Sequence, residues 1–174
     1  MKNFIRFSTI LLVITFCSID ASVKAQTKNY QVYALFVLNI AKYSSWPSQN
    51  AEFRITVFGK SKVYDELVKI STSKTVNGIP IRVNQTDDLS ELGNQEMVYL
   101  SDGKSGALSD VLQTMQGKSI MVITEREGLF KKGAGFSFVQ TESNTLRFDI
   151  NNTELEKRQI KVSKNLSTLA NSVL

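Results

Sequence analysis

The sequence predicts an α/β fold in which a largely parallel sheet carries helices on both faces and an added antiparallel hairpin. Two observations predict this fold. Short apolar runs of strand length alternate with helical segments between residues 53 and 124, which is typical of βαβ units. After residue 133 the alternation stops, and two strand-like runs follow each other directly. We therefore expect a single three-layer domain.

The first predicted element is a buried helix. Residues 30–43 are apolar on nearly every side, and the run is longer than an ordinary strand. Trp46-Pro47 follows it. Because proline disfavours helical backbone at the preceding residue, we expect the helix to end near Ser44 or Ser45.

The parallel part of the sheet is predicted to contain four strands with helices between them. Pro80 lies in the second strand and cannot donate a backbone hydrogen bond, which favours an edge position. The strands are predicted at Phe53–Phe58, Ile79–Val83, Glu96–Leu100 and Ser119–Thr124, and the helices at Val63–Ile70 and Leu108–Met115.

The last third of the chain is predicted to form the hairpin and the C-terminal helices. The hairpin strands are Phe136–Gln140 and Thr145–Ile150, and apolar and polar residues alternate in the second of them, as in a half-buried strand. Asn151 with Glu154 three residues later resembles a helix start. A final helix is expected over residues 163–173, with Leu166, Leu169, Ala170 and Val173 turned inward.

Residues 1–25 have the features of a cleavable secretory signal peptide. Lys2 and Arg6 precede a short apolar run, and the small residue Ala25 ends the segment at the expected cleavage site. Cleavage would leave residues 26–174 as one periplasmic domain. Three of the 21 basic and one of the 16 acidic residues would leave with the peptide, which takes the net charge from +5 to +3. Nucleic-acid binding is therefore not expected. The alternative, a lipoprotein anchored at Cys17, is disfavoured by the bulky Phe16.

The composition excludes much enzyme chemistry. The chain has no histidine and one cysteine, so it cannot form a Ser-His-Asp or Cys-His nucleophile or a His-ligated zinc site. Acidic clusters such as Asp87-Asp88 and Glu125-Arg126-Glu127 lie at predicted loops or helix ends, where carboxylates commonly face water. We expect a protein that is not an enzyme and has no metal site and no cofactor.

Gly-Lys-Ser occurs three times, beginning at Gly59, Gly103 and Gly117, without the preceding glycine that a P-loop requires. The first two copies follow predicted strands and precede helices, where parallel sheets bind ligands and free amides can hold an anion. Turns, helix caps and solvated lysines explain the same residues more simply. Against that simpler explanation, the alternative hypothesis is an anion site formed by Gly59, Lys60, Ser61, Gly103, Lys104 and Ser105.

A protein-contact surface is the other candidate. Leu129 and Phe130 lie in a glycine-flanked segment beside two lysines, and an apolar pair rimmed by charge is typical of a small contact patch. The alternative is that Phe130 folds back onto the sheet. Arg147, on the wet face of the hairpin, is of a residue type that often anchors interfaces. We hypothesise that Leu129, Phe130 and Arg147 contact a partner.

Six segments, in their order and spacing, resemble the YfiR-like family of bacterial periplasmic proteins. They are Tyr33–Tyr43 with Trp46-Pro47, Arg54–Gly59, Val76–Ile81, Gly128–Phe130, Arg147–Asn151 and Ile160–Ser163. The resemblance implies an α/β domain without catalysis that represses a membrane diguanylate cyclase by binding its periplasmic sensor domain. It also implies sequestration by an OmpA-like outer-membrane lipoprotein. The best-known member carries disulfides, whereas here the chain after residue 25 has no cysteine, so redox control of that kind is not expected.

Two functions follow from the sequence. The first is a periplasmic repressor that binds a membrane signalling protein in cyclic-di-GMP signalling, acting as a monomer or a homodimer. The alternative is a periplasmic sensor of a small molecule, an anion or a nucleotide, coupled to a membrane transducer. Ligand-dependent melting would separate the two.

Overall fold

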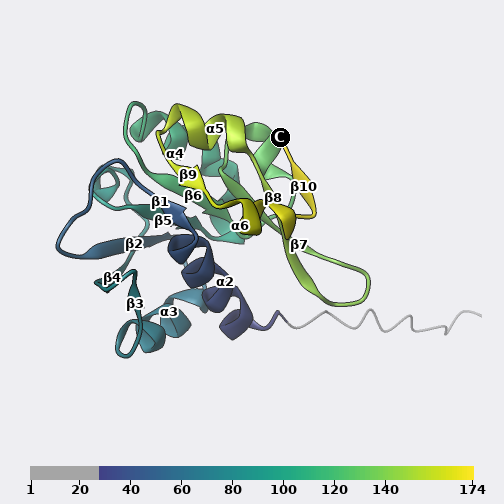
Figure 1. The fold of residues 1–174 in the computed structure, drawn as a ribbon, viewed down its shortest axis with the longest axis horizontal. Coiled ribbons are helices and arrows are strands. Elements are labelled where there is room, and N and C mark those ends of the chain that lie inside the picture. Colours follow the sequence, from purple (N-terminus) through teal and green to yellow (C-terminus); the bar gives the residue numbers. More distant parts are fainter. Residues whose placement is uncertain (1–27) are drawn as a thin grey trace, which may run out of the picture.

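One mixed sheet organises the computed structural model, which describes residues 28–174 (Figure 1). The predicted signal peptide at 1–25 lies outside these residues. The eight strands of the sheet run in the order β10-β8-β7-β6-β5-β2-β4-β3, and β1 pairs separately with β9. The strands are β1 (Ser44–Ser45), β2 (Phe53–Phe58), β3 (Thr75–Val76), β4 (Ile79–Thr86), β5 (Met97–Leu100), β6 (Met121–Thr124), β7 (Phe136–Gln140), β8 (Leu146–Ile150), β9 (Lys161–Val162) and β10 (Ser172–Val173).

The sheet confirms the predicted α/β class. Strands β4, β2, β5, β6 and β7 are parallel neighbours, and β8 then pairs antiparallel with β7 as the predicted hairpin. The helices are α2 (Tyr30–Lys42), α3 (Val63–Ser71), α4 (Leu108–Thr114), α5 (Asn152–Lys157) and α6 (Lys164–Thr168), with short 3-10 helices η1 (Leu89–Glu91), η2 (Asp102–Ala107) and η3 (Leu129–Lys132).

Helices cover both faces of the sheet, as predicted. Met97 and Tyr99 of β5 pack into the core on the α2 side, and Val98 and Leu100 of the same strand pack into a second core on the α4 side. This division follows from the alternation of side chains along a strand. Both faces are apolar because both are covered.

Helix α2 begins and ends near its predicted boundaries. The side chain of Asn29 caps its first turn by accepting a hydrogen bond from the backbone N of Val32. The helix ends at Lys42, and the chain then enters β1 before Pro47. None of the described helices is long and apolar enough to cross a membrane.

The predicted final helix is wrong in its second half. Helix α6 ends at Thr168, and the chain continues as β10 beside β8. The backbone N of Leu174 donates to the carbonyl of Ile150 at 2.9 Å, so sheet hydrogen bonds replace helical ones. Leu166 is buried as predicted, whereas Leu169 and Val173 are 62% and 47% exposed. Their helical spacing is coincidental.

The proline-containing strand β4 lies where Pro80 predicted it. It is the outermost long strand of the sheet, and only the two-residue strand β3 lies beyond it, paired at Ile79 and Pro80. The rest of β4 pairs with β2 on its inner side.

Candidate functional site

The carboxyl ends of β2, β5 and β6 meet at one edge of the sheet, and polar residues gather there. Gly59 follows β2, Ser101 and Asp102 follow β5, and Glu125 follows β6. Gly59 has a φ of +90°, and a Cβ at this position would lie 2.2 Å from Ser101 Oγ and 2.4 Å from Lys104 Cγ. Glycine is therefore required for the two loops to approach each other.

Glu125 is the centre of this cluster, and its side chain is only 3% exposed. Its Oε1 accepts hydrogen bonds from Lys28 Nζ at 2.8 Å and from the Tyr30 hydroxyl at 3.4 Å. Its Oε2 accepts from Ser61 Oγ at 3.1 Å and from the backbone N of Asp102 at 3.4 Å. A carboxylate removed from water needs such partners, because an unpaired buried charge is strongly unfavourable. We call these five residues the Glu125 cage.

A second carboxylate extends the charge network. Arg126 Nε donates to Asp102 Oδ1 at 2.7 Å, and Lys28 Nζ lies 3.7 Å from Asp102 Oδ2. The hydrogen bond from Arg126 outweighs burial and lowers the pKa of Asp102. Burial opposes the charge of Lys28, but the hydrogen bond and charge of Glu125 outweigh it and raise the pKa of Lys28. Both groups are therefore charged at neutral pH.

The first two Gly-Lys-Ser loops lie together, but their polar groups face carboxylates. The Ser61 hydroxyl donates to Glu125, and Lys104 Nζ pairs with Asp87 at 3.0 Å. Of the other hypothesised residues, Lys60 and Gly103 are exposed and Ser105 is buried in η2. A buried carboxylate beside both loops opposes an anion and favours a cation.

The hypothesised contact pair is buried. Leu129 and Phe130 in η3 are 8% and 2% exposed. The backbone N of Phe130 donates to Ser137 Oγ at 2.6 Å, and its carbonyl accepts from Asn151 Nδ2 at 2.7 Å. The segment thus folds back onto the sheet, which was the alternative interpretation, and does not present an apolar patch. Arg147 on β8 is exposed, as expected.

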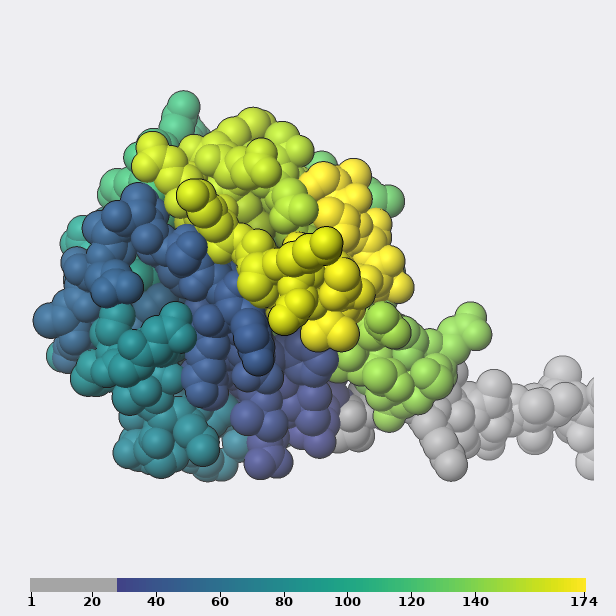
Figure 2. Space-filling view, viewed as in Figure 1, coloured from purple at the N-terminus to yellow at the C-terminus, as the bar shows by residue number. Residues whose placement is uncertain are grey.

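An apolar groove between α2 and α6 is the feature that the sequence analysis missed. Figure 2 shows the C-terminal segment lying against the helix near the N-terminus. The groove has a volume of about 260 Å³, and Tyr43 and Leu169 on it are 53% and 62% exposed. Its other lining residues are Phe36, Asn39, Ile40, Phe148, Asn165 and Leu166. It was missed because Leu169 was expected to point inward.

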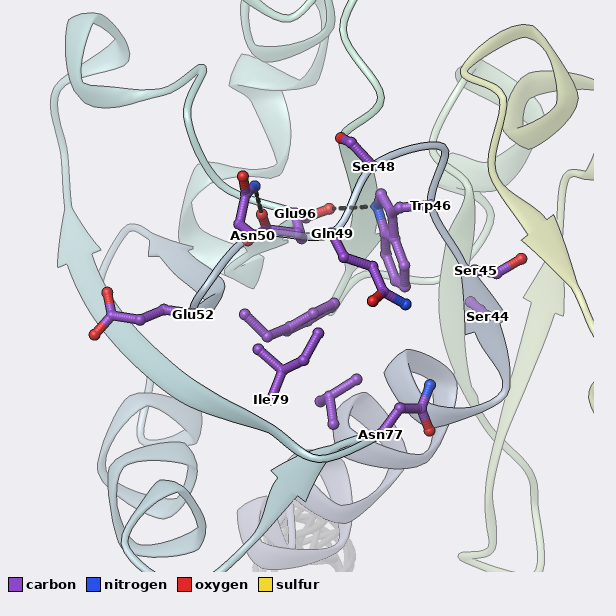
Figure 3. Close-up of a pocket in the computed structure, with 12 residues that line it drawn as sticks. Ser44, Ser45, Trp46, Ser48, Gln49, Asn50, Glu52, Asn77, Ile79 and Glu96 are labelled. Atoms are coloured by element: carbon purple, nitrogen blue, oxygen red, sulfur yellow. Dashed lines mark hydrogen bonds between the residues drawn. The ribbon is translucent and has the colours of Figure 1, made fainter.

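At the opposite, amino edge of the sheet, Glu96 fastens the loop that follows β1 (Figure 3). Trp46 Nε1 donates to the Glu96 carbonyl at 3.2 Å, and the Glu96 carboxylate accepts from Asn50 Nδ2 at 2.5 Å and from the backbone N of Arg54 at 2.6 Å. The Trp46 ring packs edge-on against Phe53. The pocket beside them measures about 60 Å³, far below the several hundred Å³ usual for ligand sites.

The comparison with known families decides what kind of protein carries these features. Residues 30–171 match the YfiR/HmsC-like family. The chain belongs to this family. The match spans all the segments on which the resemblance was based, so the resemblance is confirmed. No curated protein matches this YfiR/HmsC-like chain in sequence.

Two solved structures share the fold. One is the ABC domain from Streptococcus pneumonia in complex with L-Trp, with 9% identity and a TM-score of 0.55 over 83% of this chain and 60% of that one. The other is a conserved domain protein from Vibrio cholerae, with 13% identity and a TM-score of 0.54 over 86% of this chain and 61% of that one. The chain thus spans about three fifths of each structure, and at these identities the likeness concerns the fold alone.

Proposed function

We propose that this protein is a periplasmic, non-catalytic regulator that represses an inner-membrane signalling protein, such as a diguanylate cyclase, by binding its sensor domain. Membership of the YfiR/HmsC-like family over residues 30–171 supports the regulatory role. The exposed apolar groove between α2 and α6 supports docking and is the observation that carries this part of the proposal.

The groove has the composition of a protein-contact surface. Exposed apolar side chains that gather at one place commonly mark interaction sites. Tyr43 offers an aromatic ring, Leu169 offers an aliphatic side chain, and Asn39 and Asn165 add polar groups. Burial of a leucine side chain contributes about 1.5–3 kcal/mol, so removing such a contact from the centre of an interface should weaken a complex measurably.

Repression requires that the regulator discriminate between two states of the receptor. A binder silences a two-state receptor only if it binds the inactive state more tightly. To shift the ratio of inactive to active receptor from 1:99 to 99:1, the regulator must bind the inactive state more tightly by about 5.5 kcal/mol of binding free energy. No covalent bond needs to be made or broken.

We further propose Arg147, which is exposed on β8, as a second contact with the sensor domain. We also propose an OmpA-like outer-membrane lipoprotein as the partner that sequesters the regulator.

Binding of the purified chain to the periplasmic sensor domain of a membrane diguanylate cyclase from the same organism tests the proposal. We expect Leu169→Glu and Tyr43→Ala each to weaken binding about tenfold or more, because anchor residues contribute about 2 kcal/mol or more and about 1.4 kcal/mol corresponds to a factor of ten. Arg147→Ala tests the second contact in the same assay. Val68→Glu is the matched control, since Val68 is an exposed apolar residue on α3.

Two results would count against the proposal. If both groove variants bind as tightly as the parent protein, the groove is not the docking surface. If the parent protein binds no such sensor domain, the proposed function itself is wrong.

A further inference from the structure

The carboxylate at the centre of the Glu125 cage is held in place independently of Lys28. The backbone N of Glu125 donates to the carbonyl of Leu100 at 3.0 Å, which fixes it at the end of β6. Ser61, Tyr30 and the backbone of Asp102 supply three neutral donors from three other elements. These contacts orient both oxygens but leave the charge unneutralised.

Lys28 supplies the neutralising charge from the solvent side. It lies in the segment ahead of α2, and its side chain is 28% exposed, against 3% for Glu125. The ammonium group is therefore the part of the cage that can leave without unfolding a helix or strand. Without it, the one cation of residues 28–174 that pairs with Glu125 or Asp102 would be Arg126. The vacated cage would be net negative.

Two buried hydroxyl groups beside the cage have unused hydrogen-bonding capacity. Tyr99 and Ser101 are each 1% exposed, and within residues 28–174 no hydrogen-bond partner reaches Tyr99 Oη or Ser101 Oγ. Burial, and next the charge of Glu125, raise the pKa of Tyr99 well above its ordinary value, which keeps the hydroxyl neutral. Buried polar groups normally have partners. The Tyr99 hydroxyl lies close enough to Glu125 to feel its charge, so its free lone pairs can accept a further polar contact at the cage.

We propose that the Glu125 cage is a binding site for a primary alkylammonium group, which Lys28 occupies in cis in this structure. The carboxylates of Glu125 and Asp102, which both face Lys28, and the neighbouring Tyr99 hydroxyl oxygen suit a compact cation with three N–H donors. An incoming amine would displace Lys28 and release its side chain from the sheet edge. This inference does not depend on the proposed repression, because the cage and the α2–α6 groove share no residue.

Chemical rescue of the purified Lys28→Ala variant tests the site. We expect this variant to melt at a lower temperature than the parent protein, and n-butylamine at neutral pH, where it is an ammonium ion, to restore the loss saturably. The backbone amide resonances of Ser61, Asp102 and Glu125 should shift along the same titration. If only N-acetyl-lysine amide rescues, the source of the ammonium group is a polypeptide and not a free amine.

Three controls make the test decisive. In Lys28→Ala/Glu125→Gln, the affinity for butylammonium should fall about tenfold or more, since the amide oxygen of Gln can still accept a hydrogen bond but no longer carries the charge that strengthens it. Lys69→Ala removes another lysine that pairs with a glutamate, at 2.7 Å from Glu66, but Lys69 is 70% exposed, so no rescue is expected. Butan-1-ol should have no effect on any variant.

The proposal is overturned if neither amine produces a saturable change in melting temperature or amide resonances of Lys28→Ala. It is equally overturned if the double variant responds as strongly as the single one. If Lys28→Ala melts at the parental temperature, the shifts of the backbone amide resonances still show whether the amine binds.

Discussion

Gly59 and Gly103 occupy the same place in two copies of Gly-Lys-Ser, yet their surroundings differ. Gly59 has a φ of +90°, and a Cβ there would collide with Ser101 Oγ. A Cβ at Gly103 would meet nothing within 4 Å, and the backbone there is not left-handed. Glycine is therefore required at position 59 by the close approach of two loops, whereas at position 103 the structure would accommodate a side chain.

Substitution by alanine should separate the two glycines. We expect Gly59→Ala to lower the free energy of unfolding by about 2–4 kcal/mol, from left-handed backbone strain and overpacking together. Gly103→Ala should change it by less than about 0.5 kcal/mol. Gly78 has a similar φ of +88°, but a Cβ there would meet nothing within 4 Å. Gly78→Ala therefore isolates the backbone contribution, which should be about 1–2 kcal/mol. Urea denaturation measures all three, and equal effects at Gly59 and Gly78 would contradict the close approach.

The pH dependence of stability reports on Asp102. The hydrogen bond from Arg126, opposed by burial and aided by the charge of Lys28, lowers the pKa of Asp102 below its ordinary value of 3.8. A lowered folded-state pKa means that the contribution is present above pH 3.8 and is lost as the pH falls through the folded-state pKa.

Comparison with Asp102→Asn tests this sign. At pH 5–7 we expect the parent protein to be more stable than Asp102→Asn by at most about 1 kcal/mol, because Asp102 is partly exposed. The difference should shrink towards zero on acidification below pH 3. A difference that stays constant or grows on acidification would show that the charge of Asp102 does not stabilise the fold. Denaturant titrations across this pH range provide the measurement.

At the scale of elements, the C-terminal segment differs from its sequence-based prediction, because a strand replaces the second half of the predicted helix. The spacing of Leu166, Leu169 and Val173 suits a helix face, but β8 offers an open edge to the chain after Thr168. The backbone of Asn171 bonds to the carbonyl of Phe148 at 2.8 Å and fixes β10 there. Tertiary hydrogen bonding overrides local propensity in so short a segment.

Alanine substitutions in α6 test where the helix stops packing inward. Leu166 is 4% exposed and belongs to the core, so Leu166→Ala should cost about 2–5 kcal/mol of unfolding free energy. Leu169→Ala removes a 62% exposed side chain and should cost less than about 0.5 kcal/mol. Similar losses for both would support the longer inward-facing helix that the spacing suggested. Thermal or urea unfolding of the two variants decides.

Most of the sheet could be predicted because its strands are marked by local runs. The apolar strand β2 ends at a glycine, and α3 follows with its own period, so neither needs tertiary information. Strands β1 and β9 could not be predicted, since two residues carry no periodicity. Each strand is defined by its pairing with the other, of Ser44 with Val162 and of Ser45 with Lys161. Phe130 was ambiguous for a similar reason: its burial depends on Ser137 and Asn151.

The Glu125 cage was missed because its members are far apart in the sequence. Lys28, Ser61, Asp102 and Glu125 come from four separate segments. A signal was nevertheless present: Ser61, Asp102 and Glu125 each lie within three residues of the carboxyl end of a parallel strand, and these strand ends share one edge of the sheet. The sequence predicts a water-facing carboxylate at Glu125, because burial of a carboxylate cannot be inferred from its neighbours in sequence.

For the whole molecule, α2 connects two places of interest. Tyr30 at its start contacts Glu125 in the cage, and Tyr43 just after its end lies on the apolar groove. Helix α2 has 13 residues, from Tyr30 to Lys42, which corresponds to about 20 Å of helix. The helix is packed in the core along its length, so one wall of the groove is formed by a rigid element.

The measurement that tests the central claim most directly is the activity of a membrane diguanylate cyclase in the presence of this protein. Membranes carrying the full-length enzyme are titrated with the purified chain, with Leu169→Glu, and with Val68→Glu. We predict that synthesis of cyclic di-GMP falls saturably with the parent protein and with Val68→Glu, while Leu169→Glu requires about tenfold more protein for the same effect. Synthesis that is unchanged by the parent protein, or reduced equally by all three, would contradict repression through the α2–α6 groove.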